Sequence, residues 1–296
     1  MFKGSLVALV TPFDEQNRVD YAALKRLIEF HISEGSNGLV IAGTTGEEAT
    51  LVRSEHVDLI SRAVEFVDGR VPVIAGTGSN ATAQTIDLSL AVADSGIDAY
   101  LIVVPYYNKP VQEGMYRHFS AVADAVSKPV VVYNVPGRTS SDLLPETVAR
   151  LALHDNILGI KEATGDLERL KQIQAVVDED FMLYSGDDFT VLPFIEQGGH
   201  GVVTVSGNVV PAAMARLCSL AASGDHAQAQ ALDDSLQALN KSLFVESNPI
   251  PVKWALSQMG LMSPDLRLPL TTFNERYHNE MRAALATAGV QLENEQ

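Results

Sequence analysis

The chain has 296 residues, of which 46% are hydrophobic and 20% charged, so it is long enough to bury a large core in one or two domains. Its formal net charge of −16 at pH 7 argues against binding to nucleic acid or to anionic membranes, because like charges repel. The single cysteine, Cys218, excludes an internal disulfide and favours a cytoplasmic location. The apolar runs are too short for a membrane-spanning helix, and the N-terminal run is better interpreted as a strand than as a signal peptide.

Short β-branched segments alternate regularly with helical segments along the chain. The predicted strands are residues 5–11, 38–43, 71–76, 99–105, 129–135, 157–162, 181–186 and 201–207. Between them, apolar residues recur every three or four positions, which indicates amphipathic helices. Examples of these helical segments are residues 21–35, 54–69, 82–96 and 166–180.

The predicted strands are apolar on both faces, which is typical of a parallel sheet covered by helices. Eight strand–helix units predict a closed (β/α)₈ TIM barrel, with an open doubly wound sheet as the alternative. Only helical patterns follow, at 226–244, 247–260 and 271–289. We therefore predict a barrel domain over residues 1–224 and a C-terminal α-helical region over residues 225–296.

Active sites of such barrels lie at the C-terminal ends of the strands, and one charged side chain there is unusual. Among eight lysines, only Lys161 combines an apolar strand, "ILGIK", with that end; the others, Lys253 included, occupy undemanding positions in helices, in loops or before strands. Alternation places Lys161 on the same face as Gly159, which is predicted to leave room for it. Burial lowers the pKa of a lysine and exposes a free amine that forms Schiff bases with carbonyl compounds. The alternative is a lysine that reaches to solvent or pairs with a carboxylate.

Three further features complete a candidate site. Tyr133, at the end of the neighbouring strand, has a phenol that can donate and accept protons, although a core-packing role is equally compatible with its position. Arg138, in "NVPGRTS", suits a carboxylate, and "GTTGEEAT" at 43–50 offers successive N–H groups and two hydroxyls to a small anion.

The histidines and Cys218 lack metal-ligand spacing, so no metal site is predicted. "GTGSNA" at 76–81 lacks the acidic partner that a dinucleotide site requires.

Four motifs, "GTTGE", "YNVPGRT", "GIKEATGD" and "SNPIPVKWAL", resemble in order and spacing the dihydrodipicolinate synthase family of pyruvate-dependent class I aldolases. The likeness covers essentially the whole chain. "GTTGE", Tyr133 and Lys161 specify only the wider aldolase group, whereas Arg138 and "PYYNKP" at 105–110 favour the synthases. The resemblance implies condensation of pyruvate with L-aspartate 4-semialdehyde to 4-hydroxy-tetrahydrodipicolinate, in the diaminopimelate and lysine biosynthesis pathway.

The resemblance also implies roles for individual residues. Lys161 would form an imine with pyruvate, and Tyr133, Thr44 and Tyr107 would relay protons. Tyr107 is expected to enter the site of a neighbouring subunit, so a homo-oligomer, usually a tetramer, would be required. The lysine supplies the electron sink, so neither a metal nor an organic cofactor is expected.

Substrate-binding residues follow from the same resemblance. Thr45 would hold the carboxylate of pyruvate and Arg138 that of the semialdehyde. Gly186 and Val203 match backbone positions near the imine, although many members have isoleucine in place of Val203.

Bacterial members often carry a lysine feedback site, and several residues here match it. His56, Asn80 and Tyr106 match its pattern, and the other predicted positions of the site are Glu48, Ala49 and Gln84. Gln84 replaces a usual glutamate, and Glu48 and Arg53 also depart from the common pattern. Because one carboxylate partner of the effector's ammonium is lost, we predict weak or absent inhibition by lysine; the alternative is that Glu48 substitutes for the lost carboxylate.

Two other functions stay open at this point. The first is another pyruvate-dependent aldolase that uses a different aldehyde, such as a sugar-acid lyase. The second is a non-catalytic binding protein built on the aldolase scaffold.

Overall fold

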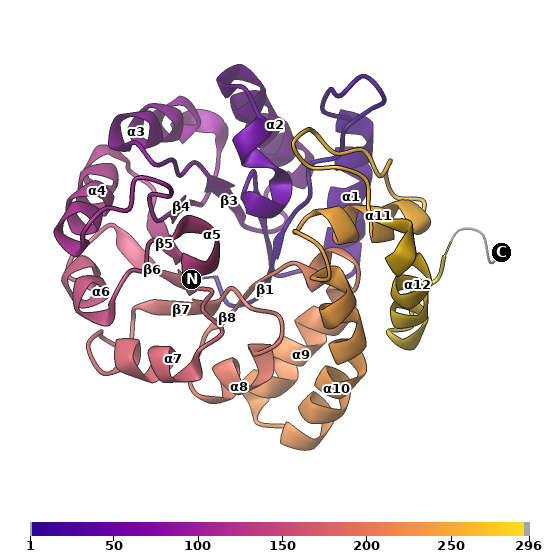
Figure 1. Cartoon of the computed structure of the whole chain (residues 1–296). Coiled ribbons are helices and arrows are strands. Elements are labelled where there is room, and N and C mark those ends of the chain that lie inside the picture. Colours follow the sequence, from indigo (N-terminus) through magenta and orange to yellow (C-terminus); the bar gives the residue numbers. More distant parts are fainter. Residues whose placement is uncertain (1, 293–296) are drawn as a thin grey trace.

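The computed structural model of the protein describes residues 2–292, and its centre is a closed barrel of eight parallel strands (Figure 1). Each strand pairs with the next, and β8 pairs with β1. The strands are β1 (Gly4–Ala8), β2 (Gly38–Ile41), β3 (Val73–Gly76), β4 (Ala99–Val103), β5 (Val130–Asn134), β6 (Ile157–Glu162), β7 (Met182–Ser185) and β8 (Gly201–Thr204). The predicted (β/α)₈ barrel is confirmed, and the open sheet is excluded.

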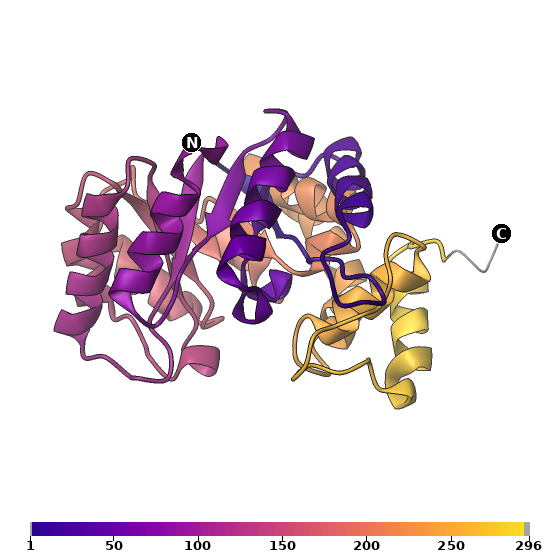
Figure 2. The same ribbon diagram turned by 90° about the horizontal axis from the view of Figure 1, so that it is seen from above.

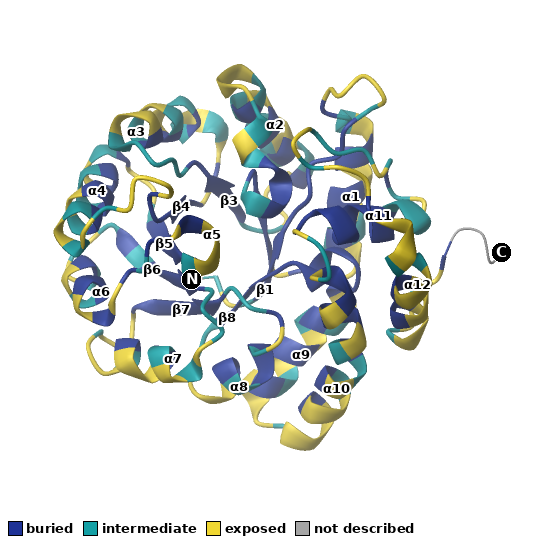
Figure 3. Cartoon of the chain, in the orientation of Figure 1, coloured by how far each residue is buried: buried dark blue, intermediate teal, exposed yellow. Residues whose placement is uncertain are grey.

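Helices follow the strands and surround the barrel. They are α1 (Tyr21–Ser33), α2 (Arg53–Val67), α3 (Thr82–Ala91), α4 (Gln112–Ala125), α5 (Pro136–Thr139), α6 (Pro145–Ala152), α7 (Leu167–Gln174), α8 (Val191–Glu196) and α9 (Pro211–Ser223). Their buried faces point to the strands and their exposed faces outward, as Figure 3 shows. In α1, for example, the Asp20 side chain caps the first turn by accepting from the Ala23 N–H, and Leu24, Leu27 and Ile28 are buried at helical spacing.

Several strands end earlier than the sequence pattern predicts. β1 ends at Ala8 rather than residue 11, and β8 ends at Thr204 rather than residue 207. The residues beyond them are buried, Leu9 and Val10 at 1% exposure. The Leu9 N–H still donates to the Val40 carbonyl oxygen at 3.0 Å, but the Val10 N–H donates to the Asn208 side chain, and Ser206–Asn208 form a 3₁₀ turn. An apolar run does not distinguish a buried strand from a buried loop, so the prediction extended too far.

The C-terminal region contains α10 (His226–Leu243), α11 (Ile250–Gln258) and α12 (His278–Thr287). α10 packs against α9 and α12, whereas α11 contacts the turn that follows β8. Figure 2 shows α11 and α12 together at one side of the barrel. Nearly all of α11 is buried, from Ile250 to Leu256. Within residues 2–292, no helix is both long enough and apolar enough to cross a membrane.

Candidate active site

A cavity of about 180 Å³ lies at the C-terminal ends of the strands. Of the eight residues predicted for catalysis and substrate binding, those that line it are Thr44, Thr45, Tyr133, Arg138, Lys161, Gly186 and Val203. The exception is Tyr107, which is 88% exposed on the loop after β4 and does not line this cavity. A larger hollow of about 620 Å³ lies at the opposite end of the barrel, beside Gly4 and His200, away from these side chains.

Lys161, near the end of β6, is 6% exposed. Burial lowers the pKa of its ammonium from about 10.5 to about 7, against the opposing influence of the Asp188 carboxylate. The register pairs Lys161 with Tyr133 on β5, and Lys161 Nζ lies 3.9 Å from the centre of the phenol ring. With a pKa near 7, the Lys161 side chain is a free amine in about half of the molecules at pH 7.

Glycine makes the space for this lysine, but not the glycine that the sequence indicated. A Cβ on Gly159 would lie 2.1 Å from the Met182 carbonyl oxygen, so Gly159 permits close packing of β6 against β7. A Cβ on Gly186 would lie 2.9 Å from Lys161 Cε and 2.6 Å from Ala163 Cβ. The prediction for Gly159 was wrong, because alternation along one strand does not reveal which neighbouring segment approaches the side chain.

Tyr133 is the second titratable group of the cavity. Burial raises the pKa of its phenol to about 12, although the Arg138 charge and a hydrogen bond with Thr44 lower it in part. The phenol is therefore protonated at neutral pH. Behind it, a space of about 10 Å³, the size of one water molecule, is lined by Thr44, Tyr133 and Glu48. Burial raises the pKa of the Glu48 carboxyl to about 7.

The anion-binding features come from the turn after β2 and from α5. After β2, Thr44–Gly46 form a 3₁₀ turn in which Thr45 is 3% exposed. Asn248 Nδ2 donates to Thr45 Oγ1 at 2.9 Å, so the Thr45 hydroxyl keeps its own proton available for the cavity. Arg138, on α5, donates from Nη2 to the Asn248 carbonyl oxygen at 3.3 Å. A hydroxyl donor and a guanidinium thus border the same small space.

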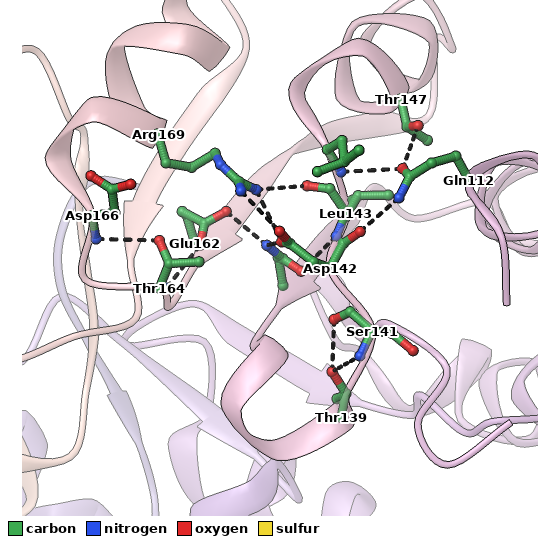
Figure 4. Close-up of polar contacts among 12 residues, drawn as sticks. Gln112, Thr139, Ser141, Asp142, Leu143, Thr147, Glu162, Thr164, Asp166 and Arg169 are labelled. Carbon is green, nitrogen blue, oxygen red and sulfur yellow. Dashed lines mark hydrogen bonds and ion pairs between the residues drawn. The ribbon is translucent and has the colours of Figure 1, made fainter. Parts of the chain in front are cut away.

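A polar network outside β5 and β6 supports these strand ends (Figure 4). Arg169 forms an ion pair of 2.9 Å with Asp142, and Asn134 Nδ2 donates to both Asp142 Oδ1 at 2.9 Å and Glu162 Oε2 at 3.0 Å. Glu162, although adjacent to Lys161 in sequence, points to the other face and bonds within this network. It is Asp188, buried after β7, whose charge opposes the loss of the proton from Lys161.

Two site residues escaped the sequence analysis. Lys253 is fully buried, and its Nζ lies 2.6 Å from Glu47 Oε1. The prediction that Lys253 occupies an ordinary helical position without a special role was therefore wrong. The available signal was the apolar surround of "PIPVKWAL", which is typical of a buried helix. Asn248 belonged to a motif quoted for the family, but no pattern along the chain indicated its contact with Thr45.

The residues predicted for regulation come from three successive units of the barrel. They are Glu48 and Ala49 after β2, His56 on α2, Asn80 after β3, Gln84 on α3 and Tyr106 after β4. The His56 ring bonds through Nε2 to the Gly76 carbonyl oxygen at 2.8 Å, and Gln84 Oε1 accepts from Ser79 Oγ at 3.1 Å. Arg53 is engaged in an ion pair of 2.6 Å with Asp87.

Cys218 is 2% exposed on α9, and burial raises the pKa of its thiol to about 12, in agreement with the prediction of a buried helix thiol. In the part of the chain that the structure describes, no three His, Cys, Asp or Glu side chains converge to hold a metal ion.

Comparison with known proteins is consistent across sequence and structure. Residues 1–288 match the Dihydrodipicolinate synthetase family. The 4-hydroxy-tetrahydrodipicolinate synthase of Pseudomonas aeruginosa is 54% identical over 290 residues, which cover 98% of this chain and 99% of the relative. That of Escherichia coli strain HS is 52% identical over 291 residues, 98% of this chain and 100% of the relative. The chloride-inhibited dihydrodipicolinate synthase of Acinetobacter baumannii, solved in complex with pyruvate, superposes with a TM-score of 0.96 at 46% identity and covers 98% of this chain and 100% of its own. This chain therefore belongs to the dihydrodipicolinate synthetase family.

Proposed function

We propose that this chain is a lyase of the class I aldolase type that condenses pyruvate with L-aspartate 4-semialdehyde to give 4-hydroxy-tetrahydrodipicolinate. The observation that carries the proposal is the buried Lys161 amine, with its pKa near 7, against the phenol of Tyr133 in a small cavity. The names of the relatives support the choice of substrates, and the pathway is that of diaminopimelate and lysine biosynthesis. The single cysteine supports a cytoplasmic location.

The reaction begins at Lys161. Its free amine attacks the keto carbon of pyruvate and water leaves, which forms an imine that withdraws electrons from the methyl group. Tyr133 then shuttles the proton that the methyl carbon releases, and the enamine results. The Thr45 hydroxyl and the N–H groups of its turn hold the pyruvate carboxylate. The protonated nitrogen of the imine is the electron sink, so this chemistry requires no cofactor.

The second substrate enters on the side of Arg138, whose guanidinium binds its carboxylate. The enamine carbon attacks the aldehyde carbon, and the resulting alkoxide takes up a proton. The amino group of the same substrate then attacks the imine carbon, closes the ring and expels the Lys161 amine. Gly186 and Val203 shape the wall beside the imine, and Gly186 keeps the path of the lysine side chain open.

The proton relay extends beyond one subunit in this proposal. Tyr107 is 88% exposed with a φ of 73°, and exposed apolar Val111 lies nearby in the chain. A phenol held outward by a left-handed backbone suits insertion into the site of a second copy, beside Thr44. The active unit is therefore a homo-oligomer, with a tetramer as the expected assembly. Sedimentation of the wild-type protein and of Tyr107→Ala tests this, and a fully active monomer would contradict it.

The proposed function is tested in two stages. Borohydride reduction in the presence of pyruvate is expected to add a pyruvyl increment to the Lys161 peptide, and a peptide without it would refute imine chemistry. A coupled assay with pyruvate and aspartate semialdehyde then compares the wild type with Arg138→Ala. The variant is expected to lose at least about tenfold in kcat/KM for the semialdehyde, because a charge-assisted bidentate contact disappears. Arg117→Ala, at an exposed arginine of α4, is the matched control.

The assay also separates the two alternatives. A sugar-acid lyase would trap pyruvate equally well but would prefer sugar acids over aspartate semialdehyde. A cationic Arg138 at the aldehyde side favours a substrate with a second carboxylate. A binding protein without catalysis would show no turnover with either.

Lysine is proposed to inhibit this protein weakly or not at all. Gln84 is neutral where the common pattern has a glutamate, and its side-chain oxygen already accepts from Ser79. Glu48 is the one carboxyl at the matching positions, and its raised pKa leaves it partly neutral at pH 7. Initial rates with and without submillimolar lysine test this; strong inhibition would contradict it.

A further inference from the structure

A buried ionic network joins the C-terminal region to the loops above the barrel. Lys253 Nζ donates to Glu47 Oε1 at 2.6 Å, and the two side chains are 0% and 1% exposed. Glu47 Oε2 accepts from the Arg267 backbone N–H at 3.1 Å, and the Arg267 guanidinium pairs with Glu55 at 2.5 Å. Both cations also lie over the ring of Phe13, at 4.3 Å and 4.2 Å from its centre. Two cations and two anions therefore balance within this network.

The network is attached directly to the anion-binding turn. Glu47 is the residue after the Thr44–Gly46 turn, and its N–H closes that turn on the Thr44 carbonyl oxygen at 3.1 Å. Its backbone is left-handed, with φ 55° and ψ 37°, an uncommon conformation for a residue with a side chain. The buried Lys253 contact holds that side chain, and hence the end of the turn, in one place. Asn248, which precedes α11, holds Thr45 of the same turn from the same region.

Fold stability alone does not account for such a pair. Withdrawing two charges from water is costly, and apolar residues of similar volume often stabilise a fold equally well or better. A short contact between two buried charges does, however, fix the positions of the two side chains relative to each other. Here that constraint applies to the turn that presents Thr44 and Thr45 to the cavity, where a displacement of about 1 Å is enough to reduce a reaction rate by about a hundredfold.

We infer that Lys253 is a positioning residue: through Glu47 it holds the Thr44–Gly46 turn in the conformation that receives the carboxylate of pyruvate. The C-terminal region thereby sets the affinity for the first substrate, although it contributes no group to the imine chemistry. This inference rests on the proposed function, and specifically on its pyruvate half. It does not depend on the identity of the aldehyde.

The decisive variant is Lys253→Met in the full chain, which removes the ammonium and keeps an unbranched side chain. We expect KM for pyruvate to rise at least about tenfold, and the rate of borohydride-trapped imine at low pyruvate to fall in proportion. KM for the aldehyde should change less than KM for pyruvate. Lys241→Met, at an exposed lysine of α10, is the matched control and should behave as wild type. A pyruvate KM within about twofold of wild type, with only a lower unfolding temperature, would overturn the inference.

Two double variants also cover the case in which the unpaired Glu47 prevents folding. Glu47→Gln with Lys253→Gln removes both charges and preserves a hydrogen bond between the two side chains. If Lys253→Met folds, this double variant should recover part of its loss in pyruvate affinity, and no recovery would contradict the inference. If Lys253→Met does not fold, Glu47→Ala with Lys253→Met decides, because it removes both charges and leaves no hydrogen bond between the two side chains: a raised KM for pyruvate is expected, and a wild-type value would refute the role. Absence of imine in the wild type refutes the proposed function instead, and is visible before any variant is made.

Discussion

The pH dependence of imine formation follows directly from the burial of Lys161. Its pKa near 7 means that about 9% of the side chains are free amines at pH 6, about half at pH 7 and about 91% at pH 8. Because only the free amine attacks pyruvate, the rate of imine formation should rise about fivefold from pH 6 to pH 7 and less than twofold from pH 7 to pH 8, then level off. An unperturbed lysine would instead gain about tenfold with every pH unit up to pH 9.

The measurement is rapid mixing with pyruvate well below saturation, a borohydride quench at set times, and mass spectrometry of the Lys161 peptide. Lys161→Arg, which retains a cation but cannot form the imine, defines the background. A rate that keeps rising tenfold per unit beyond pH 8 would show that the amine is not desolvated, and the physical basis of the proposed catalysis would be lost.

The same structure makes three further predictions. Lys161→Met should raise the free energy of unfolding by up to about 5 kcal/mol at pH 6, because it removes the cost of burying the Lys161 charge. The pKa of Lys161 is lower in the folded than in the unfolded chain, so this cost is complete below about pH 7 and disappears as the pH rises toward 10.5. Urea titrations should therefore show a smaller increase in the free energy of unfolding at pH 9 than at pH 6. Gly186→Ala should slow imine trapping at least about tenfold, because the added Cβ would lie 2.9 Å from Lys161 Cε and 2.6 Å from Ala163 Cβ; near-UV circular dichroism checks that the fold is native, and normal trapping would contradict this geometry. Asn248→Ala should raise KM for pyruvate about fivefold to tenfold in steady-state assays, the effect of one hydrogen bond lost from Thr45, and an unchanged KM would show that this bond does not orient the hydroxyl.

The strand–helix alternation was sufficient to predict the barrel, because each strand is apolar on both faces and each helix has one apolar face. The ends of the strands were harder to predict. The last ladder bond after β1 is donated by Leu9 to Val40, and a 3₁₀ turn follows β8, yet the residues beyond remain buried, so the apolar pattern continues past the hydrogen-bonded ladder.

The central pair of the site was also predictable. Lys161 and Tyr133 end consecutive strands, and consecutive strands are neighbours in a barrel, so their order in the chain already implied that they meet. The role of Tyr107 stays a prediction, since it concerns a second copy of the chain.

The sequence alone was sufficient to predict the barrel and the presence of Lys161 at the C-terminal end of a buried strand, because hydrophobic periodicity and strand order can be recognised from residues close together in the chain. Tertiary packing decided that Gly186 rather than Gly159 makes room for this lysine, and that Lys253 is the second buried ammonium. Lys253 and Glu47 are 206 positions apart in the chain, and the contact exists only because α11 packs against the loops of the first two strands. The pKa of a buried lysine is lowered because surrounding segments exclude water from its ammonium group, and the local sequence does not reveal which distant segments pack around it.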